Sequence, residues 1–478
     1  MTSASAIGHS PGAGRPEELV GSDIQVQVAS GDLITYAFLD NAASTPAMVA
    51  AANAVAELLP WYASIHRGAG LKSRVATVAY EEARSRIARF LSVGQDHVVI
   101  LTKSATEGLN RLARMFGDHR AIVFTSIMEH HANLLPWRLS GCELRYVQAD
   151  AYGVLDEEDL RRQLLGTSTA RPRIVSIAGV YNVSGYAPPV HHLARMAHEN
   201  GAEIIVDAAQ LVAHRPLAVR GVSADDELDY VVFSGHKVYA PFGSGVLIAR
   251  RSTVERAQPN IVGGGIVDLV TLDDVVWNSL PDREEAGSPN VLGAVAIGAA
   301  MERLEILGRQ QLAAEEQSLT SYAMRHLNEV PGLRILGPPD GPDRTGVVSF
   351  VLGGLPHGLV AAALSHEYGI GVRSGCFCAH PGVMHLLAEP PAVAQLHLDQ
   401  MRAHEHCSLP GAVRVSLGIQ NSEHDIRRLS TALLALSQDG ARCQYEVNQE
   451  SGEYMPALAL PMPTLPLSMG AAANSSSV

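Results

Sequence analysis

The chain has 478 residues, of which 47% are hydrophobic, so it is long enough for a large buried core and two domains of ordinary size. Its formal net charge of -13 and its lack of basic runs argue against a nucleic-acid-binding surface and against binding to an anionic membrane. No apolar stretch has the roughly 18 residues of a membrane span, and residues 1–30 lack a signal-like apolar core. The five cysteines are too few for a disulfide framework, so we expect free thiols in a cytoplasmic protein.

The first half of the chain alternates between strand and helix patterns. Residues 1–30 are rich in Gly, Ser and Ala, and the first predicted strand covers residues 34–39. Helical patterns such as 78–91 then alternate with short apolar strands. These predicted strands cover residues 98–101, 121–124, 173–177, 204–206, 230–233 and 245–248. The alternation predicts an α/β fold with a large, doubly wound and mostly parallel sheet.

The pattern changes after a helix predicted over residues 291–307. A long helix over about 311–330 is followed by strands at 347–352 and 413–417, which flank a helix near 359–368. This order of elements predicts a second, smaller α/β domain in the C-terminal part of the chain.

These patterns suggest four parts. We expect a flexible lead-in over 1–30 and a large domain over 31–310, whose segment 31–48 is able to pack on the small domain. The small domain is expected over 311–438. Residues 439–478 lack the pattern of a packed element and are expected to form a flexible tail.

Two polar residues follow two neighbouring apolar strands. Asp207 comes directly after residues 204–206, and Lys237 closes the segment Ser234-Gly235-His236-Lys237 after residues 230–233. Both would stand at the carboxyl ends of parallel strands, where α/β sheets bind ligands. Pyridoxal phosphate needs a lysine for a Schiff base and a carboxylate beside its ring nitrogen. The pair therefore predicts a pyridoxal phosphate site, although either residue alone could be a surface lysine or a helix cap.

Two further segments could complete such a site. Residues 104–108 follow a predicted strand and open a helix, where backbone N–H groups and the Thr106 hydroxyl could bind a phosphate. An ordinary helix cap is the alternative interpretation of this segment. Residues 128–131 follow the next strand and include two histidines, one of which could stack on the cofactor ring.

The sequence resembles the fold-type I, class V aminotransferase family, and within it the group II cysteine desulfurases and selenocysteine lyases. The resemblance covers roughly residues 34–435. It implies a fold-type I pyridoxal phosphate enzyme and rests on several blocks together. The matching blocks are residues 39–46, 62–68, 106–110, 129–133, 207–210, 234–237, 285–290, 373–381 and 414–417.

The resemblance implies a role for each matching residue of the cofactor site. Lys237 would bind pyridoxal phosphate covalently, Asp207 would pair with its pyridine nitrogen, and Gln210 with its phenolic oxygen. His130 would stack on the ring. The positions that match the family's phosphate ligands are Ala105, Thr106, Ser234 and His236.

The same resemblance implies where the substrate and a second subunit bind. Arg414 matches the arginine that pairs with the substrate carboxylate, and Asn182 and Arg373 lie at other substrate-side positions. Ser288 matches a residue that reaches the phosphate of the partner subunit. A homodimer with shared active sites is therefore expected.

Cys378 matches the family's sulfur-accepting nucleophile. The implied reaction converts L-cysteine to L-alanine, leaves a persulfide on Cys378, and passes its sulfur to an acceptor protein or scaffold. Cys376 departs from the family, because many group II members carry histidine there. The Cys-Phe-Cys segment also resembles molybdenum cofactor sulfurases, which is a second interpretation. Cys376 is either an auxiliary thiol or a bystander in the loop.

A second departure is the insertion over residues 389–410. It contains His397, His404, His406 and Cys407, a spacing that can indicate a metal site. No complementary ligand pair is evident, so we predict a polar surface insertion and no metal.

Two other classes of function stay open. The chain could be another class V enzyme, such as a selenocysteine lyase, a cysteine-sulfoxide lyase or an epimerase, but these reactions need no thiol such as Cys378. It could also be an inactive relative that serves as a binding protein, although Lys237, Asp207, His130 and Arg414 are all present.

Overall fold

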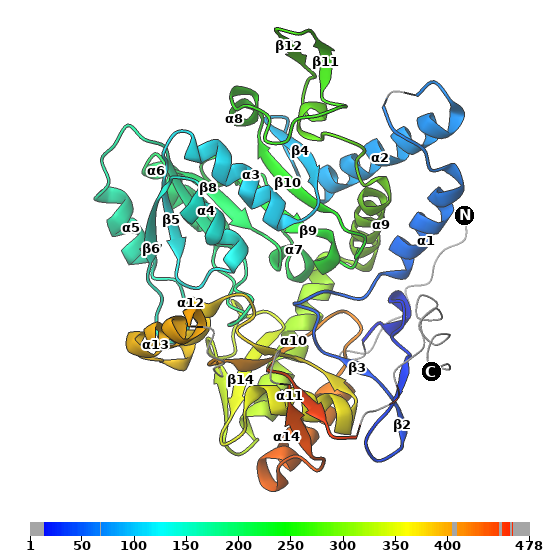
Figure 1. Ribbon diagram of the computed structural model, residues 1–478, viewed down its shortest axis with the longest axis vertical. Coiled ribbons are helices and arrows are strands. Elements are labelled where there is room, and N and C mark those ends of the chain that lie inside the picture. The colour runs from blue at the N-terminus through cyan, green and yellow to red at the C-terminus, as the bar shows by residue number, and fades with distance from the viewer. Residues whose placement is uncertain (1–13, 67, 404–408, 449–451, 459–460, 462–478) are drawn as a thin grey trace, which may run out of the picture.

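The computed structural model describes residues 14–66, 68–403, 409–448, 452–458 and 461. Its largest element is a seven-stranded sheet with the strand order β4-β10-β9-β8-β7-β5-β6 (Figure 1). All strands run parallel except β10, which pairs antiparallel with both β4 and β9. The bounds are β4 His97–Thr102, β5 Ile122–Ser126, β6 Glu143–Val147, β7 Arg173–Ala178, β8 Glu203–Asp207, β9 Tyr230–Ser234 and β10 Gly245–Arg250. The predicted mostly parallel sheet is confirmed.

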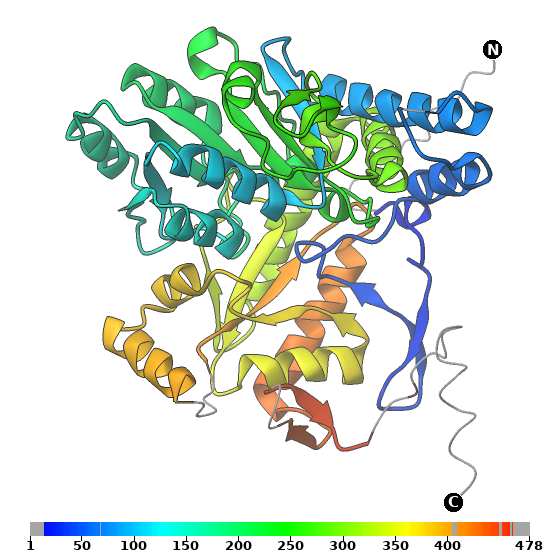
Figure 2. The ribbon, with the colours of Figure 1, turned by 45° about the horizontal axis from the view of Figure 1, so that its top comes forward.

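Helices cover both faces of this sheet (Figures 1 and 2). Alternate strand residues point to opposite faces: Val99 and Val231 belong to one core, and Ile100 and Val232 to the other. The first face packs against α1 Val49–Leu58, α2 Leu71–Phe90, α5 Glu157–Leu165, α6 Val190–Glu199 and α9 Val291–Leu307. The second packs against α3 Ala105–Gly117, α4 Leu135–Leu139 and α8 Arg251–Arg256. Strands buried on both faces have continuous apolar sequences, which is why they could be predicted.

The edge strand β6 does not follow from the sequence pattern. It carries Glu143 and Arg145, and most of its residues are exposed or half-buried. It nevertheless pairs in parallel with β5 along its whole length. The reversed strand β10 has a simple cause, because only residues 235–244 separate it from β9, too few for the helical crossover that a parallel pair requires.

The C-terminal part forms a four-stranded antiparallel sheet with its own apolar core. Its strands, in spatial order, are β13 Leu333–Leu336, β14 Val347–Leu352, β17 Ala412–Ser416 and β16 Arg373–Gly375. Three helices pack against this sheet and contribute to the same core, namely α10 Arg309–Asn328, α11 His357–Tyr368 and α14 Glu423–Asp439. The predicted helices and strands of this region are present, whereas β13, β16 and α14 are additional.

The N-terminal part crosses between the two sheets. Within residues 14–30, expected as a loosely ordered lead-in, strand β1 (Gln25–Gln27) pairs with β2 (Leu33–Thr35). The single strand expected over 34–39 is divided, because the next strand, β3 (Ala37–Phe38), pairs with β15 (Ile370–Gly371) of the C-terminal part. Such pairing over more than 300 residues leaves no local sequence pattern.

The stretch expected as a flexible tail also contains paired backbone. Strands β18 (Tyr445–Val447) and β19 (Tyr454–Pro456) form an antiparallel hairpin, and the Tyr445 hydroxyl donates a 3.0 Å hydrogen bond to Glu367 on α11. These paired residues differ from the expectation of a flexible tail over 439–478, because a short two-stranded hairpin has little periodic signal.

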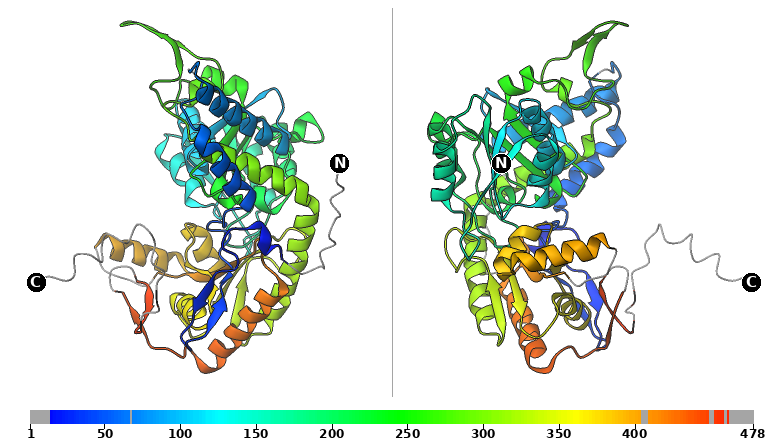
Figure 3. Two further views of the ribbon diagram at one scale, coloured as in Figure 1. Left: turned by 90° about the vertical axis from the view of Figure 1, so that its right-hand side faces the viewer. Right: turned by 60° about the vertical axis from the view of Figure 1, so that its left-hand side comes forward.

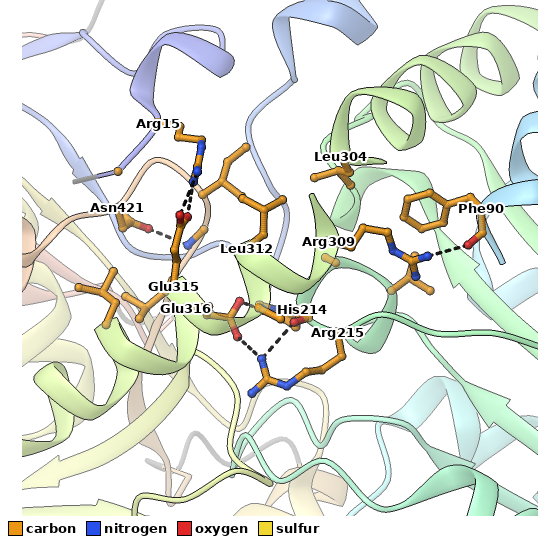
Figure 4. A pocket seen from close by; sticks show the side chains of 18 residues that line it. Arg15, Phe90, His214, Arg215, Leu304, Arg309, Leu312, Glu315, Glu316 and Asn421 are labelled. Atoms are coloured by element: carbon orange, nitrogen blue, oxygen red, sulfur yellow. Dashed lines mark hydrogen bonds and ion pairs between the residues drawn. The ribbon is translucent and has the colours of Figure 1, made fainter. Parts of the chain in front are cut away.

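Polar contacts join the two parts along helix α10 (Figure 4). Glu315 forms an ion pair with Arg15, and Glu316 accepts a 2.5 Å hydrogen bond from Nδ1 of His214, at the end of the short helix α7 (Leu211–His214). Glu316 also accepts from the backbone N–H of Gly346 beside β14. These contacts help to hold the two sheets in place on either side of the cleft between them.

Two segments extend from this body. A hairpin of β11 (Val267–Val270) and β12 (Val275–Trp277) projects beyond the large sheet (Figure 3). On the other side, α12 (His380–Leu387) and α13 (Pro391–Arg402) follow one another beside the cleft. In the described part of the chain, no helix combines the length and apolar character that crossing a bilayer would require.

Candidate active site

A cavity of about 290 Å³ lies between the ends of the large-sheet strands and the small sheet. Strands β7, β8 and β9 deliver residues to it at their carboxyl ends, as expected for an α/β sheet. The cavity gathers all but one of the residues to which the resemblance assigns a cofactor, substrate or nucleophile role. They are Ala105, Thr106, His130, Asn182, Asp207, Gln210, Ser234, His236, Lys237, Arg373, Cys378 and Arg414.

Asp207 and Lys237 face this cavity from adjacent parallel strands. Asp207 lies opposite Val232 in the register of β8 and β9, is 5% exposed, and accepts a 3.0 Å hydrogen bond from the N–H of Ala209. Burial raises the pKa of Asp207, whereas the charge of Lys237 lowers it. Burial likewise lowers the pKa of Lys237, against the attraction of Asp207. A buried carboxylate requires a cationic partner, and a protonated pyridine nitrogen fits this position.

The start of helix α3 forms an anion site at the same end of the cavity. Ser104 caps the helix by accepting a hydrogen bond from the N–H of Glu107, and the N–H of Ala105 donates a 2.8 Å hydrogen bond to Oγ of Ser234. A Cβ atom on Gly245 would lie 2.6 Å from Cα of Ser104, so only glycine allows β10 to approach this loop. The helix N-terminus and the hydroxyl groups suit a phosphate.

Two imidazoles border the cavity in their neutral form. Nδ1 of His130 accepts a 3.0 Å hydrogen bond from the N–H of Ala132, which orients the ring. Burial and the nearby charge of Lys237 lower the pKa of His130 to about 3. The same two causes lower the pKa of His236 to about 4. A neutral, oriented ring at His130 is suited to stacking on a planar cofactor.

Glu129, next to His130, lies fully inside the protein. Its carboxylate accepts hydrogen bonds of 2.9 Å from the N–H of Ala178 and 2.7 Å from Nδ2 of Asn133. Burial raises the pKa of Glu129 to about 8. The residue was part of a matching sequence block, but its role as a buried brace for the β5 and β7 ends could not be inferred from spacing alone.

Arg414 presents a buried guanidinium to the cavity. Its Nη1 donates a 3.0 Å hydrogen bond to the backbone carbonyl of Asn182, and its Nη2 lies 3.5 Å from Oδ1 of Asp40. Among the described residues, Nε of Arg414 has no hydrogen-bond partner. Burial lowers the pKa of Arg414 to about 10, against the attraction of Asp40. A guanidinium that lines a cavity suits a substrate carboxylate.

Asp40 was missed by the sequence analysis as a site residue. It joins both arginines of the site, because its Oδ2 forms a 2.8 Å ion pair with Nη2 of Arg373 and its Oδ1 faces Nη2 of Arg414. Asp40 lies in the matching block 39–46, which was its only sequence signal.

Cys378 occupies a tight turn between the two sheets. The N–H of Ala379 donates a 2.9 Å hydrogen bond to the carbonyl of Cys376, and Phe377 and Cys378 both have φ of 54°. Two residues of the large-sheet side hold the turn: Nδ2 of Asn182 donates to the Phe377 carbonyl at 2.8 Å, and the N–H of His131 donates to the Cys378 carbonyl at 2.7 Å. The Cys378 side chain is exposed and lines the cavity. These contacts offset the strain of two left-handed residues.

Ser288 is the residue that the structure does not bring to this cavity. It lines a separate pocket with His66 and Gly265. The insertion over 389–410 contains α13, none of whose residues is buried. His404, His406 and Cys407 lie outside the described residues, and within the described ones no group of three His, Cys, Asp or Glu side chains could hold a metal.

The fold and this cavity define an α/β protein with a lysine and a carboxylate at the ends of adjacent strands. The model of the family described as aminotransferase class-V matches residues 37–429. The chain belongs to the aminotransferase class-V family.

Individual relatives agree with this assignment. A probable cysteine desulfurase of Streptomyces coelicolor is 36% identical over 369 residues, which are 74% of this chain and 85% of the relative. A cysteine desulfurase of Haloferax volcanii is 34% identical over 87% of this chain and 93% of its own. The solved apo structure of a cysteine desulfurase from Thermococcus onnurineus superposes with a TM-score of 0.75 at 29% identity, covering 84% of this chain and 95% of that one.

Proposed function

We propose that the protein is a pyridoxal phosphate-dependent cysteine desulfurase. It converts L-cysteine to L-alanine and transfers the sulfur, as a persulfide on Cys378, to an acceptor protein or scaffold. The observation that carries this proposal is the shared cavity, where an exposed thiol on an anchored turn faces both Lys237 and Arg414. The relatives described above are named cysteine desulfurases, which supports it.

The residues of the cavity fit pyridoxal phosphate. Lys237 would bind it covalently, Asp207 would hold its ring nitrogen, Gln210 its phenolic oxygen, and the ring would lie against His130. The phosphate would lie at the start of α3, within reach of Ala105, Thr106, Ser234 and His236. When bound, the cofactor supplies an electron sink for the carbon skeleton of the amino acid.

The substrate is oriented by groups of both sheets. Arg414 would pair with the carboxylate of L-cysteine, since its guanidinium lines the cavity. Asn182 and Arg373 border the same space. Because Asp40 already holds Arg373 and approaches Arg414, it would keep both cations near the cavity in the absence of substrate.

Two protein groups perform the chemistry. Once the amine of L-cysteine has displaced it from the cofactor, the free Lys237 amine, whose pKa is lowered by burial, would take the α-proton of the bound amino acid as a general base. The thiolate of Cys378 then attacks the sulfur of the substrate. A sulfur–sulfur bond forms as the carbon–sulfur bond breaks, the electron pair passes to the carbon skeleton, and proton uptake yields alanine.

The oligomeric state, the domain limits and the cellular location of the enzyme can be proposed as well. We infer a homodimer in which the pocket of Ser288 receives the phosphate of the partner's site, because this pocket lies apart from the chain's own cavity. The core of the second sheet supports a small domain over 311–438 beside a large domain over 31–310. Ala37 and Leu39 join this core, and Val383 and Leu386 pack in the core of the large sheet, so the two domains also pack on one another. A cytoplasmic location agrees with the free thiols of the described cysteines.

A second candidate comes from the Cys-Phe-Cys turn, which favours a reaction like that of molybdenum cofactor sulfurases. That reaction shares the desulfurase step and differs only in the acceptor. Selenocysteine lyase, cysteine-sulfoxide lyase and epimerase reactions would need no thiol at Cys378.

The proposal is tested by alanine formation from L-cysteine, in the presence of a reductant, at matched cofactor occupancy. We expect the parent to form alanine, Cys376→Ala to keep more than about a tenth of its rate, and Cys378→Ala to fall below that. Equal activity or equal inactivity of the parent and Cys378→Ala would contradict the assignment of the nucleophile. Activity with selenocysteine or cysteine sulfoxide that survives Cys378→Ala would favour a lyase.

A further inference from the structure

The turn that carries Cys378 holds a second thiol two residues earlier. The hydrogen bond from the N–H of Ala379 to the carbonyl of Cys376 closes a four-residue turn. In such a turn the first and third Cα atoms lie roughly 5 to 6 Å apart. This separation lies within the range of Cα distances that disulfides span. Cys376 and Cys378 are both unpaired thiols in the structure.

The surroundings of the two thiols differ. Cys378 is exposed to the cavity, whereas Cys376 is half-buried and packs against the core of the large sheet. Burial raises the pKa of Cys376, and the charge of Cys378 adds to this, while the backbone N–H of Cys378 opposes it. Cys376 is therefore mostly a protonated, slow thiol near neutral pH. Because Cys378 is the more exposed of the two thiols, it is the one that a substrate or an acceptor can contact directly.

Residues outside the turn hold its backbone and its Phe377 ring in place. Asn182 and His131 hold the carbonyls of Phe377 and Cys378, and the guanidinium of Arg414 lies 4.8 Å from the centre of the Phe377 ring. These contacts come from elements outside the turn, so the separation of the two cysteines is set by the fold and not by a free loop.

We propose that Cys376 is a resolving thiol that closes a disulfide with Cys378 when no acceptor removes the persulfide sulfur. The inference rests on the proposed desulfurase function. The Cys376 sulfur attacks the inner sulfur of the Cys378 persulfide, forming the Cys376–Cys378 bond. The bond to the outer sulfur breaks, and that sulfur leaves with the electron pair and a proton as hydrosulfide. The persulfide is itself the oxidant, so no other oxidant is required.

This step would give the enzyme a second activity, the release of hydrosulfide, and it would also halt further turnover. One molecule of L-cysteine and the two thiols yield alanine, hydrosulfide and a disulfide, after which Cys378 can accept no further sulfur. A disulfide across a turn with two left-handed residues is strained and is easily reduced. A thiol or phosphine reductant would therefore restore turnover.

The test uses the reduced holoenzyme with L-cysteine, without acceptor or reductant, followed by rapid alkylation and peptide mass spectrometry. Trypsin cleaves after Arg373 and Arg402, so both cysteines stay in one peptide. In the parent we expect this peptide to be lighter by two hydrogen atoms and unalkylated, with one hydrosulfide released per alanine. In Cys376→Ser and Cys376→Ala we expect an alkylated persulfide at Cys378. Cys443→Ser alters a half-buried thiol whose backbone N–H bonds to Glu367 on α11 and which does not line the cavity. It serves as the control and should match the parent.

Every other outcome of this experiment contradicts the resolving role of Cys376, and the outcomes can be told apart. A stable Cys378 persulfide in the parent, or a persulfide located on Cys376, would overturn the resolving role while leaving the desulfurase function intact. The same disulfide in protein never exposed to L-cysteine would show ordinary air oxidation and overturn it too. Absence of alanine in the parent and in both Cys376 variants would overturn the proposed function together with the inference.

Discussion

The backbone N–H of His131 donates a 2.7 Å hydrogen bond to the carbonyl of Cys378. His131 is the neighbour of His130, the residue expected to lie against the cofactor ring. Its own ring stacks on His380 with centroids 5.0 Å apart, and its Nε2 lies 3.2 Å from Nδ1 of His380. The turn of the proposed nucleophile is thus tied to the element that borders the cofactor space. We conclude that the two sheets position the thiol jointly.

The first prediction concerns the other anchor of this turn. Asn182→Ala removes the 2.8 Å hydrogen bond to the Phe377 carbonyl. The loss of about 1 kcal/mol should increase opening of the turn roughly fivefold. Hydrogen exchange of the backbone over residues 374–380 measures this directly. Asn200→Ala is the matched control, because Asn200 makes a similar 2.8 Å hydrogen bond to Met196 on helix α6, away from the site. Equal exchange in parent and Asn182→Ala would contradict the anchoring role.

Much of the cofactor site could be predicted because its residues follow predicted strands directly. Asp207 and Lys237 stand at the ends of β8 and β9, and the parallel order of these strands brings them together. The contacts across the cleft could not be predicted in this way. Asp40 and Arg414 are separated by 374 positions in sequence, and no periodicity links them.

Among the helices and strands as well, most of those with a local sequence signal could be predicted and those that depend on long-range contacts could not. Helix α9 has the predicted bounds, Val291–Leu307, because it is apolar on nearly all sides and therefore gives a strong local signal. Edge strands with polar residues, such as β6, give none. Strand β3 exists only because β15 pairs with it. Local pattern thus identified the buried strands of the large sheet, whereas helix α14 was missed although it is amphipathic and partly buried, and long-range pairing determined β3.

The second prediction concerns the substrate carboxylate. Arg414→Lys keeps the charge but loses the planar set of donors, so kcat/KM for L-cysteine should fall roughly 10- to 100-fold, mainly through KM. Steady-state alanine formation over a range of L-cysteine concentrations measures both constants. Arg161→Lys, an exposed change on α5, should leave them unchanged. A fall in kcat alone would show that Arg414 acts on a step other than substrate binding.

The third prediction concerns a buried ion pair outside the cavity. Glu285 accepts hydrogen bonds from Nη1 of Arg84 at 2.7 Å, from the Tyr80 hydroxyl at 2.6 Å and from the N–H of Leu101 at 2.7 Å. Glu285→Gln removes the buried counter-charge of Arg84 and leaves only Glu81, whose side chain is partly exposed, as its ionic partner. The change should therefore lower the free energy of unfolding by about 3 kcal/mol. Urea unfolding followed by circular dichroism measures the loss.

A surface pair provides the control for this change. Glu302 pairs with Arg86 where both side chains are partly exposed, so Glu302→Gln should cost less than about 1 kcal/mol. Similar losses in the two variants would show that burial does not strengthen the Arg84–Glu285 pair.

The last prediction concerns pH and stability. His198, on helix α6, has both ring nitrogens against acceptors: Nε2 lies 2.9 Å from Oδ2 of Asp229, and Nδ1 lies 2.7 Å from the Asp225 carbonyl. The hydrogen bond to Asp229 raises the pKa of His198, although burial and Arg250 oppose this. Because the folded pKa lies above the unfolded value of about 6.5, the stabilisation is complete below that pH and is lost as pH rises through the folded pKa.

His198→Gln should therefore cost more stability in acid than in base. We expect Tm to fall by roughly 2 °C more at pH 5.5 than at pH 8.5, relative to the parent at each pH. Differential scanning calorimetry on the two proteins measures this difference. His119→Gln, an exposed change after helix α3, should produce no such pH dependence. A deficit that grows with rising pH would reverse the sign and show that His198 is held in its neutral form, as an acceptor of a hydrogen bond and not as a cation beside Asp229.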